Sequence, residues 1–521
     1  MLFVSLSNLT VKRLCMRLFA VSFVVHILSA WFNEGFHQFD EHFQVIEFAS
    51  YKRGVTPVTA LPWEFPARIR PAMQPAIAFA VFEAMDSAGV FQPFRAMFIL
   101  RLISALFGWA TAVIITLYAL RWLKQERSQR LLIWLSALFW CAPYLHARFS
   151  SESWSAMALF LGVITVLYGS ESSPAHQGLR RWCIMAAGGL LLGFSFEMRF
   201  QSAIAVAGFI AWLGAYKRHW RESMAILGGI ACMLGVGAVL DAWLYGAYVF
   251  PPWNYVNVNL MQGMAATFGV EPWWWYFTTF ALWLAVPPLG IIALIGLGWA
   301  CCRYWRNPFV WVFVPFVAVH CLIGHKEERF LFPMIFAVPV LLALAVEGIL
   351  SNDSSPWQRW AQSALEQRWL RITVIVLNGI LLAVMTIKPA STQIPIYEYC
   401  YDSAARSAAP LVVYSLDGSP YQFDNAIKTL PPMEIMFYQP INFRVESVTE
   451  KELRTALAQA QQTNQSLLFF HKSKPPSVLS DTNIVETVVA SSFPTWTRFV
   501  NINHWMERSN VWMIYECRLK Q

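Results

Sequence analysis

A series of apolar segments, each long enough to cross a lipid bilayer, occupies the first 388 residues of the chain. A helix of about 20 apolar residues spans the ~30 Å hydrocarbon core of a membrane. By this rule we expect about eleven spans. They begin near Leu14, Ala96, Leu131, Ser153, Cys183, Ser202, Met224, Phe277, Phe309, Leu331 and Ile372. The pattern predicts an all-α polytopic membrane protein.

The composition agrees with this class. Only 13% of the residues are charged, whereas a soluble globular domain has about 25%. The 25 Trp and 39 Phe suit a chain with many aromatic residues at membrane interfaces. The net charge of +8 raises the alternative of nucleic-acid binding. Because the basic residues gather in short loops between apolar spans, they are better explained by membrane orientation, with lipids and not nucleic acid as partners.

The loop charges also predict an orientation. Positive loops stay in the cytoplasm, and here every second connection is basic. These connections are the N-terminal segment with Lys12, Arg13 and Arg17, and the ranges 121–130, 180–181, 217–221, 303–306 and 359–371. We therefore expect the N-terminus in the cytoplasm and the other loops on the non-cytoplasmic face.

Two domains are expected. Residues 1–388 form the transmembrane domain, in which 33–95 is a long external loop. Residues 389–521 form an extracytoplasmic α/β domain, because apolar runs at 411–414 and 466–470 flank a helical pattern at 449–462. A disulfide between Cys400 and Cys517 is possible on that side of the membrane.

A run of five ionisable residues, His325-Lys326-Glu327-Glu328-Arg329, lies between two apolar spans. A Lys, Arg or Asp at the bilayer centre costs about 2.5–3.5 kcal/mol on insertion scales. The run therefore marks a membrane surface or a polar cavity. Its two carboxylates and three bases suit a phosphate or sugar ligand.

Further polar residues are expected on the same face. They are Asp40, Glu41, Glu64, Arg68, Arg70, Arg148, Glu152, Arg199, Trp253 and Asn254. Several have a simpler alternative. Asp40 and Glu41 also suit a helix N-terminus, Arg148 and Glu152 the i,i+4 pair of one helix face, and Arg199 an interfacial residue whose charged end reaches water. The three consecutive Trp residues at 273–275 in the same loop as Trp253 also suit an interfacial anchor. A metal at Asp40-Glu41-His42 is not expected, because no spaced ligands occur elsewhere.

These motifs, in this order, resemble those of the dolichyl-phosphate-mannose-dependent mannosyltransferases of N-glycan and glycosylphosphatidylinositol assembly, glycosyltransferase family 22, whose fold is of the GT-C type. The resemblance lies in Asp40-Glu41 with Gln44, Trp63-Glu64 with Arg68-Ile69-Arg70-Pro71, Arg148-Phe149-Ser150 with Glu152, Asp241 with Tyr245-Gly246, Trp253-Asn254, Gly269 with Pro272-Trp273 and Tyr276, and the run from His325 to Pro333. It covers about residues 15 to 350. Pro71 stands where the family usually has Ser, and Phe39 where Pro or Cys is common, which bears on the acceptor and the donor sugar. The departures and the extra outer domain favour a bacterial member.

The resemblance implies an inverting transfer of mannose, or a related sugar, from a polyprenyl- or dolichyl-phosphate donor to a hydroxyl of a lipid-linked or glycan acceptor. Asp40, with Glu41 beside it, is the expected general base. Lys326 and Arg329 are expected to hold the donor phosphate, with Arg199 and Arg148 in reserve. Glu327 and Glu328 would orient these cations. Glu64 with Arg68 or Arg70 would shape a substrate pocket. No cofactor or metal is expected.

Two alternatives remain from the sequence. A transporter or flippase of a lipid-linked sugar would also need charged groups facing a membrane cavity. It predicts polar residues at mid-membrane in broken helices, whereas here the charges gather at one set of helix ends. The second alternative is a related glycosyltransferase that moves a different sugar. The expected location is the bacterial inner membrane with a periplasmic site, or the endoplasmic reticulum membrane with a luminal site in a eukaryote.

Overall fold

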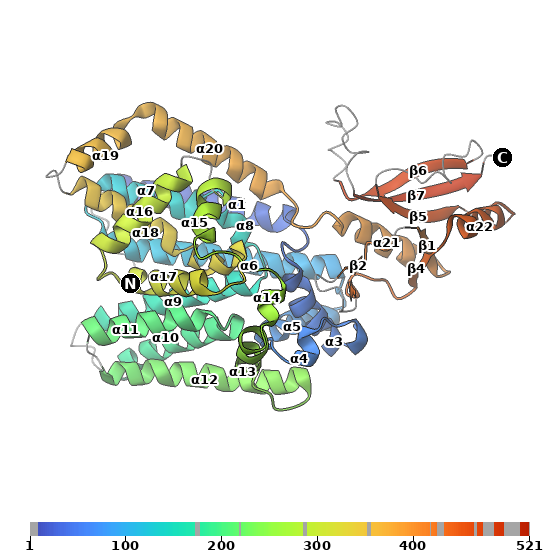
Figure 1. Ribbon diagram of the computed structural model, residues 1–521, viewed down its shortest axis with the longest axis horizontal. Helices are drawn as coiled ribbons and strands as arrows, with labels where there is room; N and C mark the ends of the chain where they lie inside the picture. Colours follow the sequence, from blue (N-terminus) through green and yellow to red (C-terminus); the bar gives the residue numbers. More distant parts are fainter. Residues whose placement is uncertain are drawn as a thin grey trace. The chain divides into compact units, whose positions relative to one another are not determined.

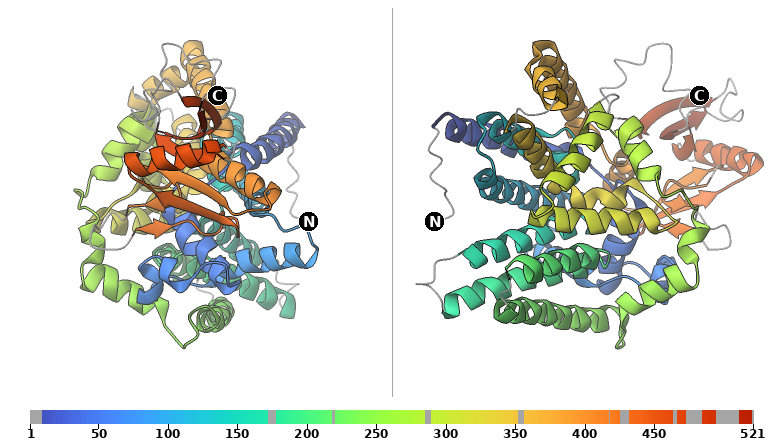
Figure 2. Two further views of the ribbon diagram at one scale, coloured as in Figure 1. Left: turned by 90° about the vertical axis from the view of Figure 1, so that its right-hand side faces the viewer. Right: turned by 60° about the vertical axis from the view of Figure 1, so that its left-hand side comes forward.

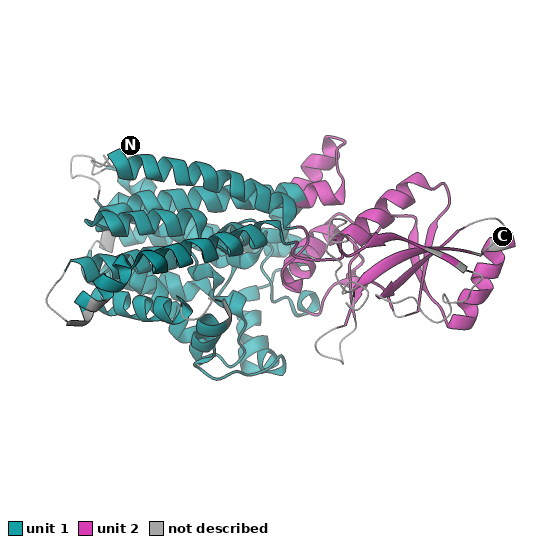
Figure 3. Ribbon diagram, turned by 90° about the horizontal axis from the view of Figure 1, so that it is seen from above, with its two compact units in different colours: residues 1–33, 64–78, 98–388 teal, residues 34–63, 79–97, 389–521 magenta. Residues whose placement is uncertain are grey.

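The computed structural model describes residues 9–171, 178–217, 220–284, 289–351, 356–416, 418–424, 432–462, 466–472, 484–493 and 511–519. The chain divides into two compact units (Figure 3). Unit 1 contains Met1–Asn33, Glu64–Ala78 and Phe98–Lys388, and unit 2 contains Glu34–Trp63, Phe79–Met97 and Pro389–Gln521. One division falls after Lys388, where the sequence pattern changes. However, much of the expected external loop belongs to the same compact unit as the C-terminal part of the chain.

Unit 1 is built from helices (Figure 1). A helix, straight or broken, lies at each of the expected span positions. The long helices are α1 (Leu9–Phe32), α6 (Pro93–Ala119), α7 (Glu126–Leu138), α9 (Ser151–Glu171), α10 (Leu179–Met198), α11 (Ser202–Tyr216), α12 (Trp220–Tyr245), α16 (Leu289–Arg303), α17 (Pro308–Leu322), α18 (Ala337–Leu350), α19 (Pro356–Glu366) and α20 (Arg368–Ile387). The shorter ones are α4 (Glu64–Ala67), η3 (Leu120–Trp122), α8 (Ala142–His146), α13 (Pro251–Val256), η5 (Asn257–Met261), α14 (Met264–Thr267), α15 (Trp275–Thr279), η6 (Phe280–Leu284) and η7 (Glu328–Met334).

Several of these helices are long and apolar enough to cross a membrane. Within the described ranges there are 5 such helices, or up to 6 if η7 and α18, bent by 64° at their junction, form one broken span. Three shorter apolar helices are α11, α16 and α17. The multi-pass helical class is thus confirmed, whereas the number of eleven crossings stays a prediction.

Helices α9, α10 and α12 lie side by side (Figure 1, Figure 2). Glycines permit a close approach between α10 and α12. A Cβ at Gly189 would overlap the carbonyl oxygen of Ile226, and one at Gly229 that of Ala186. Such small residues are typical of helix contacts in membranes. Helix α9 is the most buried of the long apolar spans, and Ser155 and Ser195 join it to α10 by a 2.9 Å hydrogen bond. The start of α9, where Glu152 lies, is therefore held firmly.

Unit 2 contains a five-stranded mixed sheet of order β4-β1-β5-β7-β6. Strand β1 (Leu411–Ser415) is parallel to β4 (Phe443–Ser447) and β5 (Leu467–Lys472), while β7 (Trp512–Leu519) is antiparallel to β5 and β6 (Ile484–Ser491). Strands β2 (Gln422–Phe423) and β3 (Met433–Glu434) form a small second sheet. The helices are α21 (Ile394–Arg406) and α22 (Glu450–Gln462), and from the first loop α2 (Phe39–Glu41), η1 (His42–Ile46), α3 (Glu47–Lys52) and η2 (Val58–Ala60). Helix α5 (Met73–Ser87) contributes to both units, and so does α6, whose residues 93–97 belong to unit 2.

The predicted C-terminal sheet is thus present. One face of it packs against α22, where Leu453 and Leu457 meet Phe469 and Tyr515 in an apolar core. Cys400 and Cys517 are buried free thiols, so the possible disulfide between them is not formed.

Candidate functional site

A buried ion pair joins the ends of two central helices in unit 1. Glu152 lies in the first turn of α9, and Arg199 directly follows α10. Arg199 Nη1 donates to Glu152 Oε1 at 2.6 Å, and both side chains are only 5% exposed. The Arg199 guanidinium also lies 5.2 Å from the centre of the Phe330 ring. The pair holds both charges at the point where α9 begins and α10 ends.

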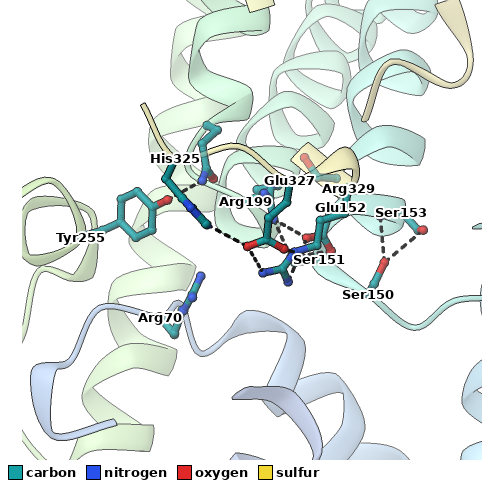
Figure 4. A network of polar contacts seen from close by, with 12 residues as sticks. Arg70, Ser150, Ser151, Glu152, Ser153, Arg199, Tyr255, His325, Glu327 and Arg329 are labelled. Atoms are coloured by element: carbon teal, nitrogen blue, oxygen red, sulfur yellow. Dashed lines mark hydrogen bonds and ion pairs between the residues drawn. The ribbon is translucent and has the colours of Figure 1, made fainter. Parts of the chain in front are cut away.

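The run from His325 to Phe330 extends this pair into a network (Figure 4). Arg329 donates two hydrogen bonds to Glu327, at 2.6 and 3.0 Å, and its Nη1 lies 3.7 Å from Glu152. His325 Nε2 lies 3.0 Å from Glu327 Oε1, and His325 Nδ1 lies 3.1 Å from the carbonyl oxygen of Gly269. The five charged side chains therefore form one continuous chain of contacts.

The contacts of this network favour the ionised forms of Glu327 and His325. Burial acts to raise the pKa of Glu327, but the hydrogen bonds and charges of His325 and Arg329 outweigh it and lower this pKa to about 2. The hydrogen bond to Glu327 raises the pKa of His325 above its ordinary value. With His325 protonated, three cations face two carboxylates. The excess positive charge suits an anionic ligand such as a phosphate.

Two other predicted phosphate ligands are engaged elsewhere within unit 1. Lys326 is buried, and its ammonium donates to the carbonyl oxygens of Glu271, Ile323 and Gly324. Three acceptors match the three N–H bonds of an ammonium group. Arg148 is 2% exposed and donates to the carbonyl oxygen of Asn33 at the end of α1. These contacts favour structural roles for Lys326 and Arg148.

The Trp-Glu segment of the first loop forms a second polar group in unit 1. Arg70 Nη2 lies 3.8 Å from Glu64 Oε1, and its guanidinium lies 5.9 Å from the centre of the Tyr255 ring. Figure 4 shows the Arg70 side chain pointing toward the network. Arg68 is exposed and has a positive φ of 52°, which is uncommon for a residue with a Cβ.

Helices α12 and α13 hold the backbone of this segment. Tyr245 Oη donates to the carbonyl oxygen of Arg70 at 2.8 Å, and Asn254 Nδ2 donates to that of Arg68 at 3.2 Å. Asp241 accepts a 2.8 Å hydrogen bond from the backbone N–H of Ala72. Trp253 is exposed. Of the motif residues Trp253 and Asn254, Asn254 therefore supports the loop, while the Trp253 side chain is accessible.

Sequence reasoning missed two contributors to these groups. Tyr255 accepts a 2.5 Å hydrogen bond from Gln201 Nε2 and lies beside Arg70. The Phe330 ring lies near the guanidinium groups of both Arg199 and Arg329, with the Arg329 group 5.6 Å away. The only sequence signal for Tyr255 is that it directly follows Trp253-Asn254, whereas Phe330 lies within the recognised run from His325 to Pro333 and was given no role there.

Glu328 and the Asp-Glu motif complete the predicted set. Glu328 is exposed and begins η7. Asp40 and Glu41 belong to unit 2, in the three-residue helix α2. Glu41 Oε2 accepts a 3.1 Å hydrogen bond from the backbone N–H of His37. This contact agrees with the simpler interpretation of Glu41 as a group that binds exposed N–H bonds at a helix start.

No group of three or more His, Cys, Asp and Glu side chains suited to a metal ion occurs in the part of the chain that the structure describes. The network above is instead an arrangement of cations and carboxylates at the ends of apolar helices. Such a site can bind an anion on a lipid and stabilise negative charge that develops on it.

Comparison with known proteins identifies the class. A model of the Alg9-like mannosyltransferase family matches residues 17–422. The chain therefore belongs to this family, and it is a multi-pass membrane protein.

Relatives show the same class. The chain is 22% identical over 380 residues to mannosyltransferase APTG1 of Arabidopsis thaliana, which covers 69% of this chain and 65% of that protein. It is 25% identical over 337 residues to GPI mannosyltransferase 3 of Debaryomyces hansenii, covering 61% and 57% of the two chains. The chain thus spans less than two thirds of the length of these relatives.

A solved structure shows the fold. ArnT from Cupriavidus metallidurans, in the apo state, has a TM-score of 0.50 and 13% sequence identity, over 96% of this chain and 97% of that one. At this identity the likeness concerns the fold alone. It confirms the expected GT-C-type architecture, with a helical membrane domain and a small C-terminal sheet.

Proposed function

We propose that this protein is an inverting glycosyltransferase that moves mannose, or a related sugar, from a polyprenyl-phosphate donor to a hydroxyl group of a lipid-linked or glycan acceptor. The observation that carries the proposal is the network of His325, Arg329 and Arg199 around Glu327 and Glu152. Membership of the Alg9-like mannosyltransferase family supports it. Neither the family nor the relatives support the alternative of a transporter.

The proposed reaction has one displacement step. The acceptor oxygen attacks the anomeric carbon, and the bond from that carbon to the phosphate oxygen breaks. The polyprenyl phosphate leaves with the bonding electrons, and the acceptor proton passes to a carboxylate. On the family motif we assign that base to Asp40. Arg329 and Arg199, with His325, are assigned to stabilise the charge on the phosphate.

The donor phosphate needs no metal ion in this proposal. The charge on a monophosphate leaving group can be neutralised by protein cations alone, because guanidinium groups bind its oxygens in a bidentate manner. Arg329 is better suited than Lys326, because Lys326 already donates to three backbone carbonyl groups. Loop charge assigns the reaction to the non-cytoplasmic face, which is periplasmic in a bacterium and luminal in a eukaryote.

The test uses membranes of the native host, since these contain the acceptor. Radiolabelled polyprenyl-phosphate-mannose is added to membranes with the wild-type protein or with Asp40→Asn. Label that enters a new product only with the wild-type protein supports the proposal and supplies the acceptor for identification. Label that merely crosses the bilayer would indicate a transporter, and neither transfer nor crossing would mean that mannose is the wrong sugar.

A further inference from the structure

Residues that follow Lys388 hold the segment 34–47, which carries Asp40, at three places within unit 2. The first is its beginning. The backbone N–H groups of Ala390 and Ser391 donate to the carbonyl oxygen of Glu34 at 2.8 and 3.0 Å. Gly35 has a φ of +82°, and a Cβ there would overlap Ser391. The chain can therefore pass this closely only with glycine at position 35.

The second place is the helix that carries Asp40. Phe39 directly precedes Asp40, and its ring meets the edge of the Phe423 ring at 5.1 Å between centres. Phe36 and Phe43 also lie against Phe423, at 6.2 and 6.1 Å. One aromatic side chain of β2 thus packs on residues before and after Asp40. Edge-to-face aromatic pairs of this kind contribute about 0.5–1.5 kcal/mol each beyond burial.

The third place is Glu47, which is fully buried. Its Oε1 accepts hydrogen bonds from the backbone N–H groups of Met436 and Phe437, at 2.9 and 3.0 Å, and lies 2.8 Å from His42 Nε2. Its Oε2 accepts a 2.6 Å hydrogen bond from Thr56 Oγ1. A buried carboxylate with four such partners is strongly fixed, because each bond to a charged group contributes about 1.5–3 kcal/mol.

His42 connects Glu47 with the Asp40 helix. It follows Glu41 directly, and its ring stacks on that of Tyr438 at 5.4 Å between centres and 12° between planes. Helix α2 continues without a break into η1 and α3, so Asp40 lies in the first turn of one helical segment that also contains His42 and Glu47. The orientation of Asp40 therefore follows from the contacts that hold this segment, which are those of Phe39 with Phe423, His42 with Tyr438, and Glu47 with the backbone of Met436 and Phe437.

We propose that Glu47 is a positioning residue through which the C-terminal domain fixes the orientation of Asp40. The inference rests on the proposed function, in which Asp40 is the base. It also assigns the C-terminal domain a part in catalysis. Met436, Phe437 and Tyr438 lie beyond residues 17–422, which the family model matches, so the family motif does not account for this contact.

The chain offers a closely matched control in Glu347, a buried carboxylate of unit 1. It accepts hydrogen bonds from the backbone N–H groups of Lys124 and Gln125, both at 3.0 Å, and from the Ser128 hydroxyl. It thus resembles Glu47 in its two adjacent backbone donors and one hydroxyl donor. Glu347→Ala should lower the thermal stability but leave kcat per folded protein unchanged.

The experiment compares Glu47→Ala, Glu47→Gln and Glu347→Ala. Folded protein is quantified by size-exclusion chromatography, and transfer is measured in host membranes with radiolabelled polyprenyl-phosphate-mannose. We expect Glu47→Ala to lower kcat on the order of 100-fold, because displacement of a catalytic group by about 1 Å has an effect of this size. The KM for the donor should change little. Glu47→Gln retains an acceptor oxygen and should recover most of kcat.

An equal kcat for Glu47→Ala and Glu347→Ala, per folded protein, would overturn the proposal. If Glu47→Ala does not fold, His42→Phe tests the proposal in its place. This variant retains a ring against Tyr438 and removes the hydrogen bond to Glu47. A reduced kcat with unchanged KM in His42→Phe supports the proposal, and a wild-type kcat rejects it. Absence of transfer by the wild-type protein would instead reject the proposed function, and this inference with it.

Discussion

Glu152 forms its close ion pair with Arg199 at 2.6 Å, and not with Arg148 four residues before it. Arg148 is turned to the carbonyl oxygen of Asn33. The i,i+4 spacing of Arg148 and Glu152 therefore does not produce the pair expected of one helix face. Because α9 begins only at Ser151, Arg148 precedes the helix and has no fixed helical relation to Glu152.

The first prediction concerns the stability of this pair. Arg199→Ala removes the close cationic partner of the buried Glu152 and leaves it the 3.7 Å contact to Arg329 and the hydrogen bond from the Ser151 hydroxyl. Loss of one partner of a buried ion pair costs about 3–5 kcal/mol, so the thermal unfolding midpoint of the purified protein should fall clearly. Arg127→Ala is the control, because its 3.0 Å pair with Glu366 is exposed and such pairs contribute about 0–1 kcal/mol. Equal midpoints for the two variants would contradict the prediction.

Sequence patterns predicted the helices well because apolar length is a local property. The same patterns did not predict the division into units. Glu47 contacts Met436 and Phe437, which lie nearly 400 residues further along the chain. A local sequence pattern cannot predict a contact over such a separation. The first loop was for this reason assigned to the transmembrane domain, whereas 34–63 is part of unit 2.

The candidate site shows the same limit. The motif residues Glu152 and Glu327 both contact Arg329, at 3.7 and 2.6 Å. The sequence could not show that the ammonium group of Lys326 would be used by backbone carbonyl groups. One of these acceptors is the backbone carbonyl oxygen of Glu271. Because every residue has a backbone carbonyl group, the sequence does not indicate which one a lysine will contact. Residue type therefore indicated which side chains can bind phosphate, but not that the backbone would already engage the Lys326 ammonium group.

The second prediction separates Arg329 from Lys326. Arg329→Ala should raise the KM for the polyprenyl-phosphate donor about 10- to 100-fold, in line with the loss of a hydrogen bond to a charged group. Lys326→Ala should instead lower the thermal unfolding midpoint, because three carbonyl groups lose their donor. Its donor KM should remain close to that of the wild-type protein. The reverse pattern, with the larger KM effect in Lys326→Ala, would move the phosphate site to Lys326.

The third prediction concerns the carboxylates of α2. Asp40→Asn should lower kcat about 100- to 10,000-fold, the range for loss of a general base, without a change in thermal stability. Glu41→Gln is the matched variant, since its amide oxygen can still accept the hydrogen bond from the His37 N–H. It should have the smaller effect on kcat. A larger loss in Glu41→Gln would assign the base to Glu41.

The last prediction is a pH dependence from His325. Its pKa is raised, chiefly by the hydrogen bond to Glu327. A raised pKa in the folded protein means that the contribution to stability is fully present below the ordinary value of 6.5 and is lost as the pH rises through the raised pKa. The pKa of Glu327 is lowered to about 2, so its contribution is lost only in acid, below its ordinary value of 4.5.

Between pH 5.5 and 9, only the His325 effect of these two should therefore appear. The thermal unfolding midpoint of the wild-type protein should fall relative to that of His325→Gln as the pH increases. Glu327→Gln should remove the same dependence, because it removes the carboxylate that raises the His325 pKa. The double variant should then show the same pH dependence as either single variant, although Glu327→Gln also loses the hydrogen bonds from Arg329 at every pH. Parallel pH profiles for the wild-type protein and His325→Gln would show that the pair does not link protonation to stability.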